Sequence, residues 1–240
     1  MNKECLIKEY WCKVDYEEYL GYLLSIKNEE TIEFNSKIIK TNYKMIGIKT
    51  PELRNIAKFI AKGNIISFLS CVKSTYFEEI LIEGFVIGFI KDYNLFLKYF
   101  ENFIKKIDNW AVCDMCVSSF KIMKNVDFFG LANDLINTND EFIQRVGLII
   151  ILDYYIDDNH IKRILDIVQN LRSNYYYVNM ASAWLISTCF VKYKEMTLEA
   201  IKNKKMPAFV QNKSIQKIRD SYKVNKKDKD DILKYKIKDE

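Results

Sequence analysis

Apolar residues recur along almost the whole chain every three or four positions, which is the spacing of an α-helix. Short polar joints such as NTND, IDDNH and RSN separate these apolar-periodic segments. The runs FVIGFI and VGLIIILDYY would suit strands if read alone, but their length and the lack of turn signals favour buried helices. The pattern therefore predicts an all-α protein. The helical segments begin near Asp15, Thr31, Thr50, Tyr76, Asn94, Asn109, Asp127, Asp140, Asn159, Asn174, Lys194, Gln211 and Asp228.

The spacing of these helices indicates a repeat. Helices that carry unusual residues start near Asn109, Asp140 and Asn174, and a strongly apolar helix precedes them, at intervals of roughly 31–35 residues with one more helix inside each. This rhythm is typical of a HEAT-like solenoid of helical pairs, an α–α superhelix in which each repeat covers its neighbour's apolar face. We expect residues 1–240 to form one such domain, with residues 225–240 as a charge-dense tail or last helix. A globular helical bundle is the alternative.

One predicted helix has clear signals at both ends. Thr50 followed by Pro51 has the form of an N-cap with proline at the first helical position, and Gly63 suits the stop after IAKFIAK.

Composition excludes several function classes. Lys and Arg number 37 against 32 for Asp and Glu, a mild basic excess that permits an anionic partner without requiring one. The N-terminus lacks a secretory segment and no apolar run reaches the roughly 18 residues of a membrane helix, so we expect a cytoplasmic protein that does not bind membranes. His160 is the only histidine, which disfavours histidine-based catalysis and most metalloenzymes. Cys113 and Cys116 lack a second ligand pair, so we expect core residues and no metal.

The stretch DNWAVCDMCVSSFK raises the question of why a tryptophan stands on the polar side of a helix. At about 100° per residue, Trp110 lies nearly opposite the core face, one turn before Asp114 and in line with Lys121. The core face consists of Val112, Cys116, Phe120 and Met123.

In a solenoid, residues at equivalent heights on successive repeats can converge on one ligand. Trp110, Asp114, Arg145 and Trp184 are candidates for such a row on the concave surface. Arg145 stands in an apolar helix and needs a carboxylate or a bound anion, because an unpaired buried charge costs several kcal/mol. The alternatives are an ion pair of Arg145 with Asp114 between repeats, and a core position for Trp184. Two indoles, a carboxylate and an arginine together suit a cationic centre beside a phosphate.

Five blocks of the chain resemble, in order, the AlkD-type DNA alkylation repair family. They are YKMIGIKTPELRNIAK, NWAVCD, QRVGLIIILDYY, YVNMASAWLIS and NKSIQKIRDSY, and the resemblance runs from about Thr31 to Val224. It implies a HEAT-like repeat DNA glycosylase that releases N3- and N7-alkylated purines from duplex DNA. By the same resemblance Trp110, Asp114 and Trp184 match the catalytic cleft, and Arg145 matches a position that contacts the DNA backbone.

The implied chemistry suits these residue types and requires no cofactor. A purine alkylated at N3 or N7 is already cationic, so it leaves as a neutral base without a general acid. Positive charge then develops on the deoxyribose, where Asp114 can stabilise it and orient water. The indole faces of Trp110 and Trp184 attract a cation by about 0.5–2 kcal/mol each.

Two further features bear on DNA binding. Family enzymes can carry a tyrosine at the position of Ile38. The isoleucine side chain cannot hydrogen-bond to a lesion as a tyrosine could. The segment QNKSIQKIRDSYK carries Lys213, Lys217 and Arg219, which we expect to contact phosphates in a basic cleft. We expect a monomeric glycosylase that binds alkylated duplex DNA. The competing hypotheses are a non-catalytic helical-repeat protein that binds unusual DNA, which Ile38 favours, and a protein-binding scaffold.

Overall fold

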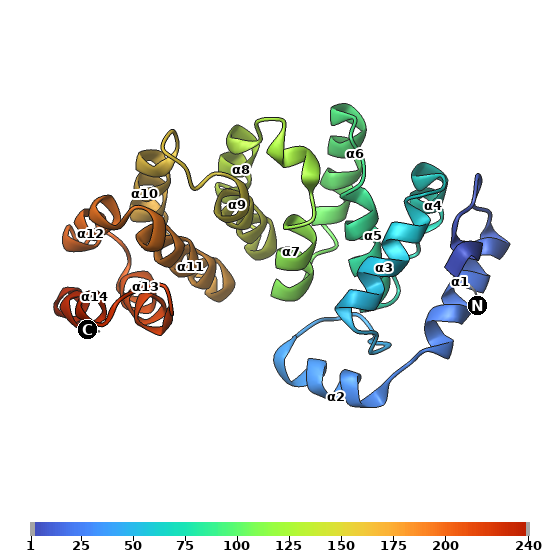
Figure 1. The fold of residues 1–240 in the computed structure, drawn as a ribbon, viewed down its shortest axis with the longest axis horizontal. Coiled ribbons are helices and arrows are strands. Elements are labelled where there is room, and N and C mark those ends of the chain that lie inside the picture. Colours follow the sequence, from blue (N-terminus) through green and yellow to red (C-terminus); the bar gives the residue numbers. More distant parts are fainter. Residues whose placement is uncertain (1–2, 239–240) are drawn as a thin grey trace. The chain divides into compact units, whose positions relative to one another are not determined.

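The computed structural model describes residues 3–238, which fold into α-helices and short 3-10 helices joined by turns and loops (Figure 1). No strand forms within this range, and an isolated bridge pairs Lys44 with Tyr76. The all-α prediction is therefore confirmed. None of the helices in the described range is long and apolar enough to cross a membrane.

The chain divides into two compact units, of which unit 1 ends at Val126 and unit 2 begins at Asp127. Unit 1 contains α1 (Lys13–Ser25), α2 (Glu29–Ile38), α3 (Thr50–Ile60), α4 (Ile65–Cys71), α5 (Phe77–Ile87), α6 (Tyr93–Ile104) and α7 (Trp110–Val117), with the 3-10 helices η1 (Lys3–Leu6) and η2 (Lys121–Lys124). Unit 2 contains α8 (Phe129–Ile136), α9 (Glu141–Tyr154), α10 (Ile161–Asn170), α11 (Tyr176–Lys192), α12 (Lys194–Lys202), α13 (Ala208–Asp220), α14 (Lys226–Asp231) and the 3-10 helix η3 (Ile232–Tyr235).

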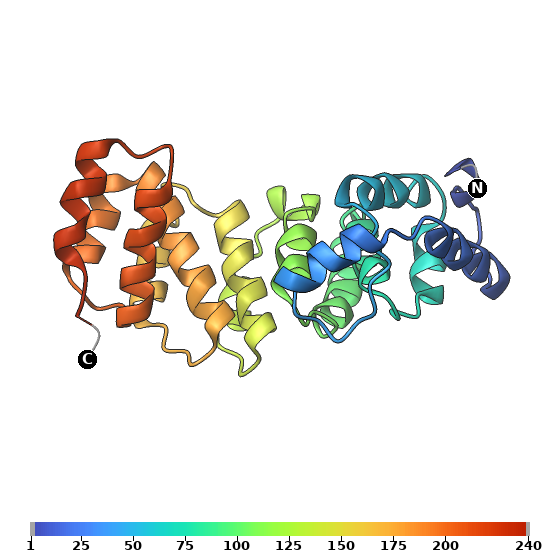
Figure 2. The same ribbon diagram turned by 90° about the horizontal axis from the view of Figure 1, so that it is seen from below.

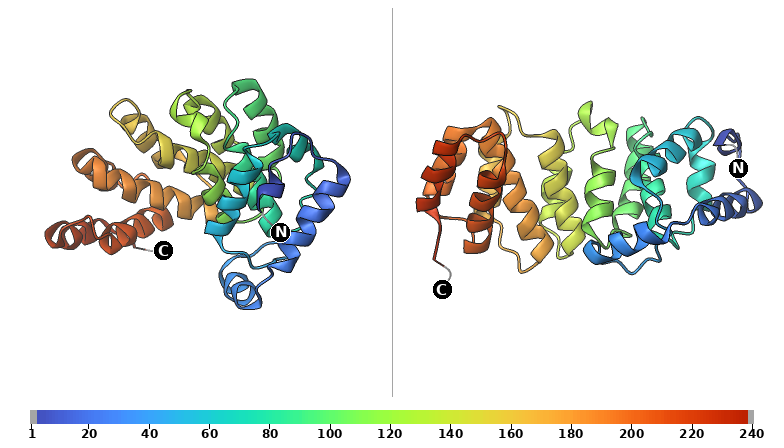
Figure 3. Two further views of the ribbon diagram at one scale, coloured as in Figure 1. Left: turned by 45° about the vertical axis from the view of Figure 1, so that its right-hand side comes forward. Right: turned by 60° about the horizontal axis from the view of Figure 1, so that its bottom comes forward.

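Helices in both units are packed as repeated pairs. In unit 1, α5 packs against α3 on one side and α7 on the other, and in unit 2, α11 packs in the same way between α9 and α13. Figures 2 and 3 show α9, α11 and α13 side by side. The helices α6, α8, α10 and α12 lie against members of these rows. The helical-repeat architecture expected from the spacing is confirmed.

The helix starts agree with the predicted ones to within three residues, but some details differ. Lys49, not Thr50, is the N-cap of α3, so the helix begins one residue earlier than the Thr-Pro signal indicates. The helix α4, capped by the Asn64 side chain, was not predicted. The helix α7 ends at Val117, so Lys121 does not continue it, although Phe120 and Met123 are buried as expected.

The helix α5 is buried along its whole length, including three glutamates. Glu78 accepts backbone N–H groups from Ile46 (2.8 Å) and Gly47 (2.7 Å), in the segment that joins α2 to α3. Burial raises the pKa of the Glu78 carboxyl, and these N–H groups oppose the shift. Gly47 itself has φ +86°, and a Cβ there would lie 2.1 Å from the Asn28 carbonyl oxygen. The α2–α3 connection is therefore fixed in one conformation that requires glycine at this position.

Candidate functional site

The Asp108 carboxylate links the start of α7 to the segment after α2 through hydrogen bonds. Asp108 accepts hydrogen bonds from the Thr41 hydroxyl (2.8 Å), the Asn42 backbone N–H (2.6 Å) and the Asn109 side chain (2.8 Å). Asn109 in turn caps α7 by accepting the Val112 N–H at 2.9 Å. The N-cap residue and its acidic neighbour thus orient the first turn of α7, which carries Trp110.

Trp110 is half-buried, and its indole Nε1–H donates to the Ile38 carbonyl at 3.1 Å. Ile38 is the last residue of α2, where backbone carbonyls have no partner within the helix. The hydrogen bond satisfies that carbonyl and fixes the orientation of the ring. It engages the edge of the indole, so it does not compete with a ligand for the ring face.

Asp114 follows one helical turn after Trp110 and is also half-buried, whereas Val112 and Cys116 are fully buried. The helix α7 therefore has a core face and a partly exposed face that carries an indole and a carboxylate, as the helical spacing predicts. Cys113 is fully buried too, which supports its interpretation as a core residue. Among residues 3–238, no cluster of three or more His, Cys, Asp or Glu side chains is arranged to hold a metal ion.

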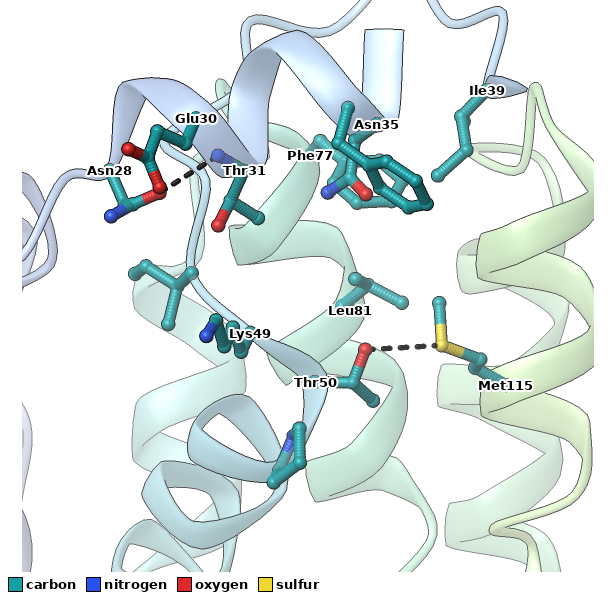
Figure 4. Close-up of a pocket in the computed structure, with 13 residues that line it drawn as sticks. Asn28, Glu30, Thr31, Asn35, Ile39, Lys49, Thr50, Phe77, Leu81 and Met115 are labelled. Carbon is teal, nitrogen blue, oxygen red and sulfur yellow. Dashed lines mark hydrogen bonds between the residues drawn. The ribbon is translucent and has the colours of Figure 1, made fainter. Parts of the chain in front are cut away.

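A cavity of about 520 Å³ lies in unit 1 between α2, α3, α5 and α7 (Figure 4). Its α7 wall is Met115, the residue after Asp114, whose sulfur contacts the Thr50 hydroxyl at 3.5 Å. Phe77 and Leu81 of α5 supply apolar lining, and α2 supplies polar side chains such as Asn35 together with the Phe34 ring. Glu30 and Lys49 add one negative and one positive side chain, so the lining is of mixed character.

Arg145 in unit 2 is 5 % exposed and connects α9 to the first turn of α11. Its Nη1–H donates to the Tyr177 carbonyl at 2.7 Å, while the Tyr177 N–H donates to Glu141 at 2.7 Å. A backbone carbonyl is thus one partner of this buried charge, which sequence reasoning did not anticipate. Asp114 belongs to the other unit, so its pairing with Arg145 stays a prediction.

Trp184 is 37 % exposed on α11, so its interpretation as a core tryptophan is wrong. It lines a depression of about 410 Å³ together with Lys217 of α13. Asp220, Ser221 and Lys223, which follow Lys217, line the same depression. Asp220 and Ser221 were missed at the sequence level, because only the close packing of α11 on α13 brings them to Trp184.

The cations of unit 2 that were expected from the sequence to contact DNA do not all lie in one place. Burial lowers the pKa of Lys217, and the positive charges of Lys213 and Arg145 lower it further. Lys213 and Arg145 therefore lie close enough to act on Lys217, and the negative charge of Asp220 opposes their effect on its pKa. Arg219 is exposed and follows Lys217 by two residues, about 200° round the helix, so it faces a different direction.

The role of Asp108 in holding the start of α7 can be tested by hydrogen exchange at the Trp110 indole. Replacing Asp108 by alanine removes three hydrogen bonds to a charged acceptor, each worth about 1.5–3 kcal/mol. The segment after α2 should then open more often, and hydrogen exchange of the Trp110 Nε1–H should accelerate by about tenfold or more. The three indole resonances of the protein report this in an NMR exchange series, with Trp11 and Trp184 as internal controls. An unchanged exchange rate at Trp110 would contradict this role of Asp108.

Residues 21–218 match the model of a family described as DNA alkylation repair enzyme. No curated protein and no solved structure gave a match.

Proposed function

Since the chain belongs to the AlkD-type DNA alkylation repair enzyme family, we propose that it is a glycosylase that releases N3- and N7-alkylated purines from duplex DNA. Family membership gives a role in the repair of alkylated DNA. The proposal of glycosylase activity rests on the partly exposed face of α7. There Trp110 and Asp114 lie one turn apart, and the Ile38 carbonyl fixes the edge of the Trp110 ring.

The proposed mechanism uses one carboxylate and the ring faces of tryptophan. An alkylated purine carries its positive charge before the glycosidic bond breaks, so the base leaves neutral and needs no proton donor. Asp114 stabilises the positive charge that develops on the deoxyribose and orients a water molecule towards it. Trp110 and Trp184 favour this charged transition state over the ground state through cation–π attraction.

DNA binding is assigned to cations of unit 2. Arg145, Lys213 and Lys217 supply positive charges that suit phosphates, and Arg219 supplies a further exposed charge on α13. Ile38, which is 48 % exposed, offers an apolar side chain in place of the tyrosine of family enzymes. Its carbonyl supports Trp110 whatever its side chain, so the support of the ring does not depend on the tyrosine.

The proposal is tested by analysing the bases released from methylated duplex DNA. We expect free 3-methyladenine and 7-methylguanine together with abasic sites. Uracil and 8-oxoguanine should stay attached, because a neutral base leaves poorly without a proton donor. A protein that binds methylated duplex but releases no base would instead be the non-catalytic DNA binder that Ile38 favours.

A single lysine should change the salt dependence of binding. If Lys217 contacts a phosphate, Lys217→Ala should flatten the log–log dependence of duplex affinity on salt by about one unit. Lys162→Ala is the matched control, since Lys162 is exposed on α10 in the same unit and does not line the Trp184 depression. Equal slopes for the two variants would contradict a phosphate contact at Lys217.

A further inference from the structure

Unit 1 contains a basic depression of about 210 Å³, which was not predicted from the sequence. Arg54 and Lys58 of α3 line it together with Lys121 and Lys124 of η2, and the C-terminal ends of α5 and α7 complete its wall. We call it the basic depression. It is separate from the cavity beside Met115 and from the Trp184 depression, because the three share no lining residue.

The four cations of the basic depression are not neutralised by the protein. None of its lining residues is acidic, and none of the four forms an ion pair with another residue in the range 3–238. Lys106, in the same unit, is by contrast paired with Glu83 at 2.6 Å. The ends of α5 and α7 contribute only about half a negative charge each. An excess of about three positive charges therefore remains in one small depression.

Two of these cations are held in place by aromatic rings. The Arg54 guanidinium lies 4.3 Å above the Phe85 ring centre, and one of its nitrogens donates to the Met115 carbonyl at 3.2 Å. Lys121 lies 5.1 Å from the ring centre of Phe89. Arginine has five N–H donors in a planar fork, so one hydrogen bond to the protein leaves others for an anion.

Glycine brings the two helix ends together at this site. A Cβ on Gly88, at the end of α5, would lie 2.7 Å from the Ser119 carbonyl oxygen just after α7. The close approach places Phe89 of one chain segment beside Lys121 of the other. The depression is thus built from packed backbone and not from freely moving surface side chains alone.

We propose that the basic depression binds a phosphate group. Phosphate is compact, carries up to two charges and offers several acceptors, which fits a planar arginine fork among three lysines. The phosphate can belong to the DNA backbone or be free in solution, and for the DNA source the inference rests on the proposed function. The depression lies at the opposite end of α7 from Trp110, about 12 Å along the eight-residue helix. That length corresponds to about three to four nucleotides along one strand of duplex DNA.

The test compares two triple variants of the full chain in binding to undamaged duplex DNA. One combines Lys58→Gln, Lys121→Gln and Lys124→Gln in the basic depression. The matched control combines Lys62→Gln, Lys98→Gln and Lys105→Gln, which are exposed lysines of unit 1 outside the depression. Both remove three charges, so long-range attraction changes equally. We expect the first variant to flatten the salt dependence by about 0.9 units more than the control, the value for one neutralised phosphate.

A second arm titrates inorganic phosphate into the wild-type protein and the first variant, read out on the amide resonances of Gly88 and Ser118. Equal DNA slopes for both triple variants, with a saturable phosphate response only in the wild type, would assign the site to free phosphate. Equal slopes with no such response would overturn the proposal. Neither arm measures base release, so a protein that releases no base can still confirm this site, and an active glycosylase can still refute it.

Discussion

Replacement of Asp114 by asparagine should slow the release of 7-methylguanine by about a hundredfold or more. The substitution keeps the size and shape of the side chain but removes the charge that opposes the developing cation on the sugar. One preorganised electrostatic contact of this kind is worth about 3–4 kcal/mol of transition-state stabilisation. Binding to undamaged duplex should hardly change, because a carboxylate repels phosphates and cannot supply affinity. Single-turnover release and duplex titrations on the same preparation measure both quantities.

A purely structural role of Asp114, as the ion-pair partner of Arg145, predicts a different result. If Asp114 pairs with Arg145 to hold two repeats together, the asparagine variant should lose thermal stability, because a buried arginine would lose its charged partner. Release would then fall only in proportion to the folded fraction. Melting temperatures recorded beside the release rates separate the two roles. A stable variant with unimpaired release would remove Asp114 from the mechanism.

Substitution of Gly47 by alanine should destabilise the protein by about 2–6 kcal/mol, from a left-handed backbone and a backbone clash that each cost about 1–3 kcal/mol. Gly47 has φ +86°, and an added Cβ would lie 2.1 Å from the carbonyl oxygen of Asn28, which cannot retreat as a flexible side chain would. At roughly 2–4 °C per kcal/mol for a chain of this size, the melting temperature should fall by about 4–24 °C. Thermal unfolding followed by circular dichroism measures the shift.

Gly21 provides the matched control for this substitution. It lies in the interior of α1, and a Cβ there would meet no atom within 4 Å. Gly21→Ala should therefore stabilise the protein by about 0.5–1 kcal/mol, because alanine loses less backbone freedom in a helix than glycine does. Opposite signs for the two substitutions support the fixed conformation of the α2–α3 connection. A melting temperature for Gly47→Ala equal to that of the wild type would contradict it.

Much of the fold could be predicted because the helix signals are local. Asn109 and Asp140 accept N–H groups of the first turns of α7 and α9, as their positions before apolar segments indicate. The end of α7 could not be predicted, since Phe120 and Met123 keep their apolar spacing after the helix has stopped. The spacing reports which residues are buried, and burial continues through the turn into η2.

The candidate site was accessible to sequence reasoning only in part. The half-buried face with Trp110 and Asp114 follows from helical spacing within a single segment. The contacts that hold this face do not, because the Ile38 carbonyl is a backbone group that no residue pattern identifies. The basic depression was missed for another reason. Arg54 and Lys121 lie far apart in the sequence, and only the packing of α3, α5 and α7 brings them to one place.

The central claim, that this protein breaks the glycosidic bond of cationic alkylpurines, is tested most directly by a single-turnover experiment with the wild-type protein. Protein in excess is mixed with a duplex that carries one 7-methylguanine, and the free base and the abasic strand are followed with time. We predict first-order appearance of both products in equal amounts, well above spontaneous depurination of the same duplex. Release no faster than spontaneous depurination, by a folded protein that binds the duplex, would contradict the claim.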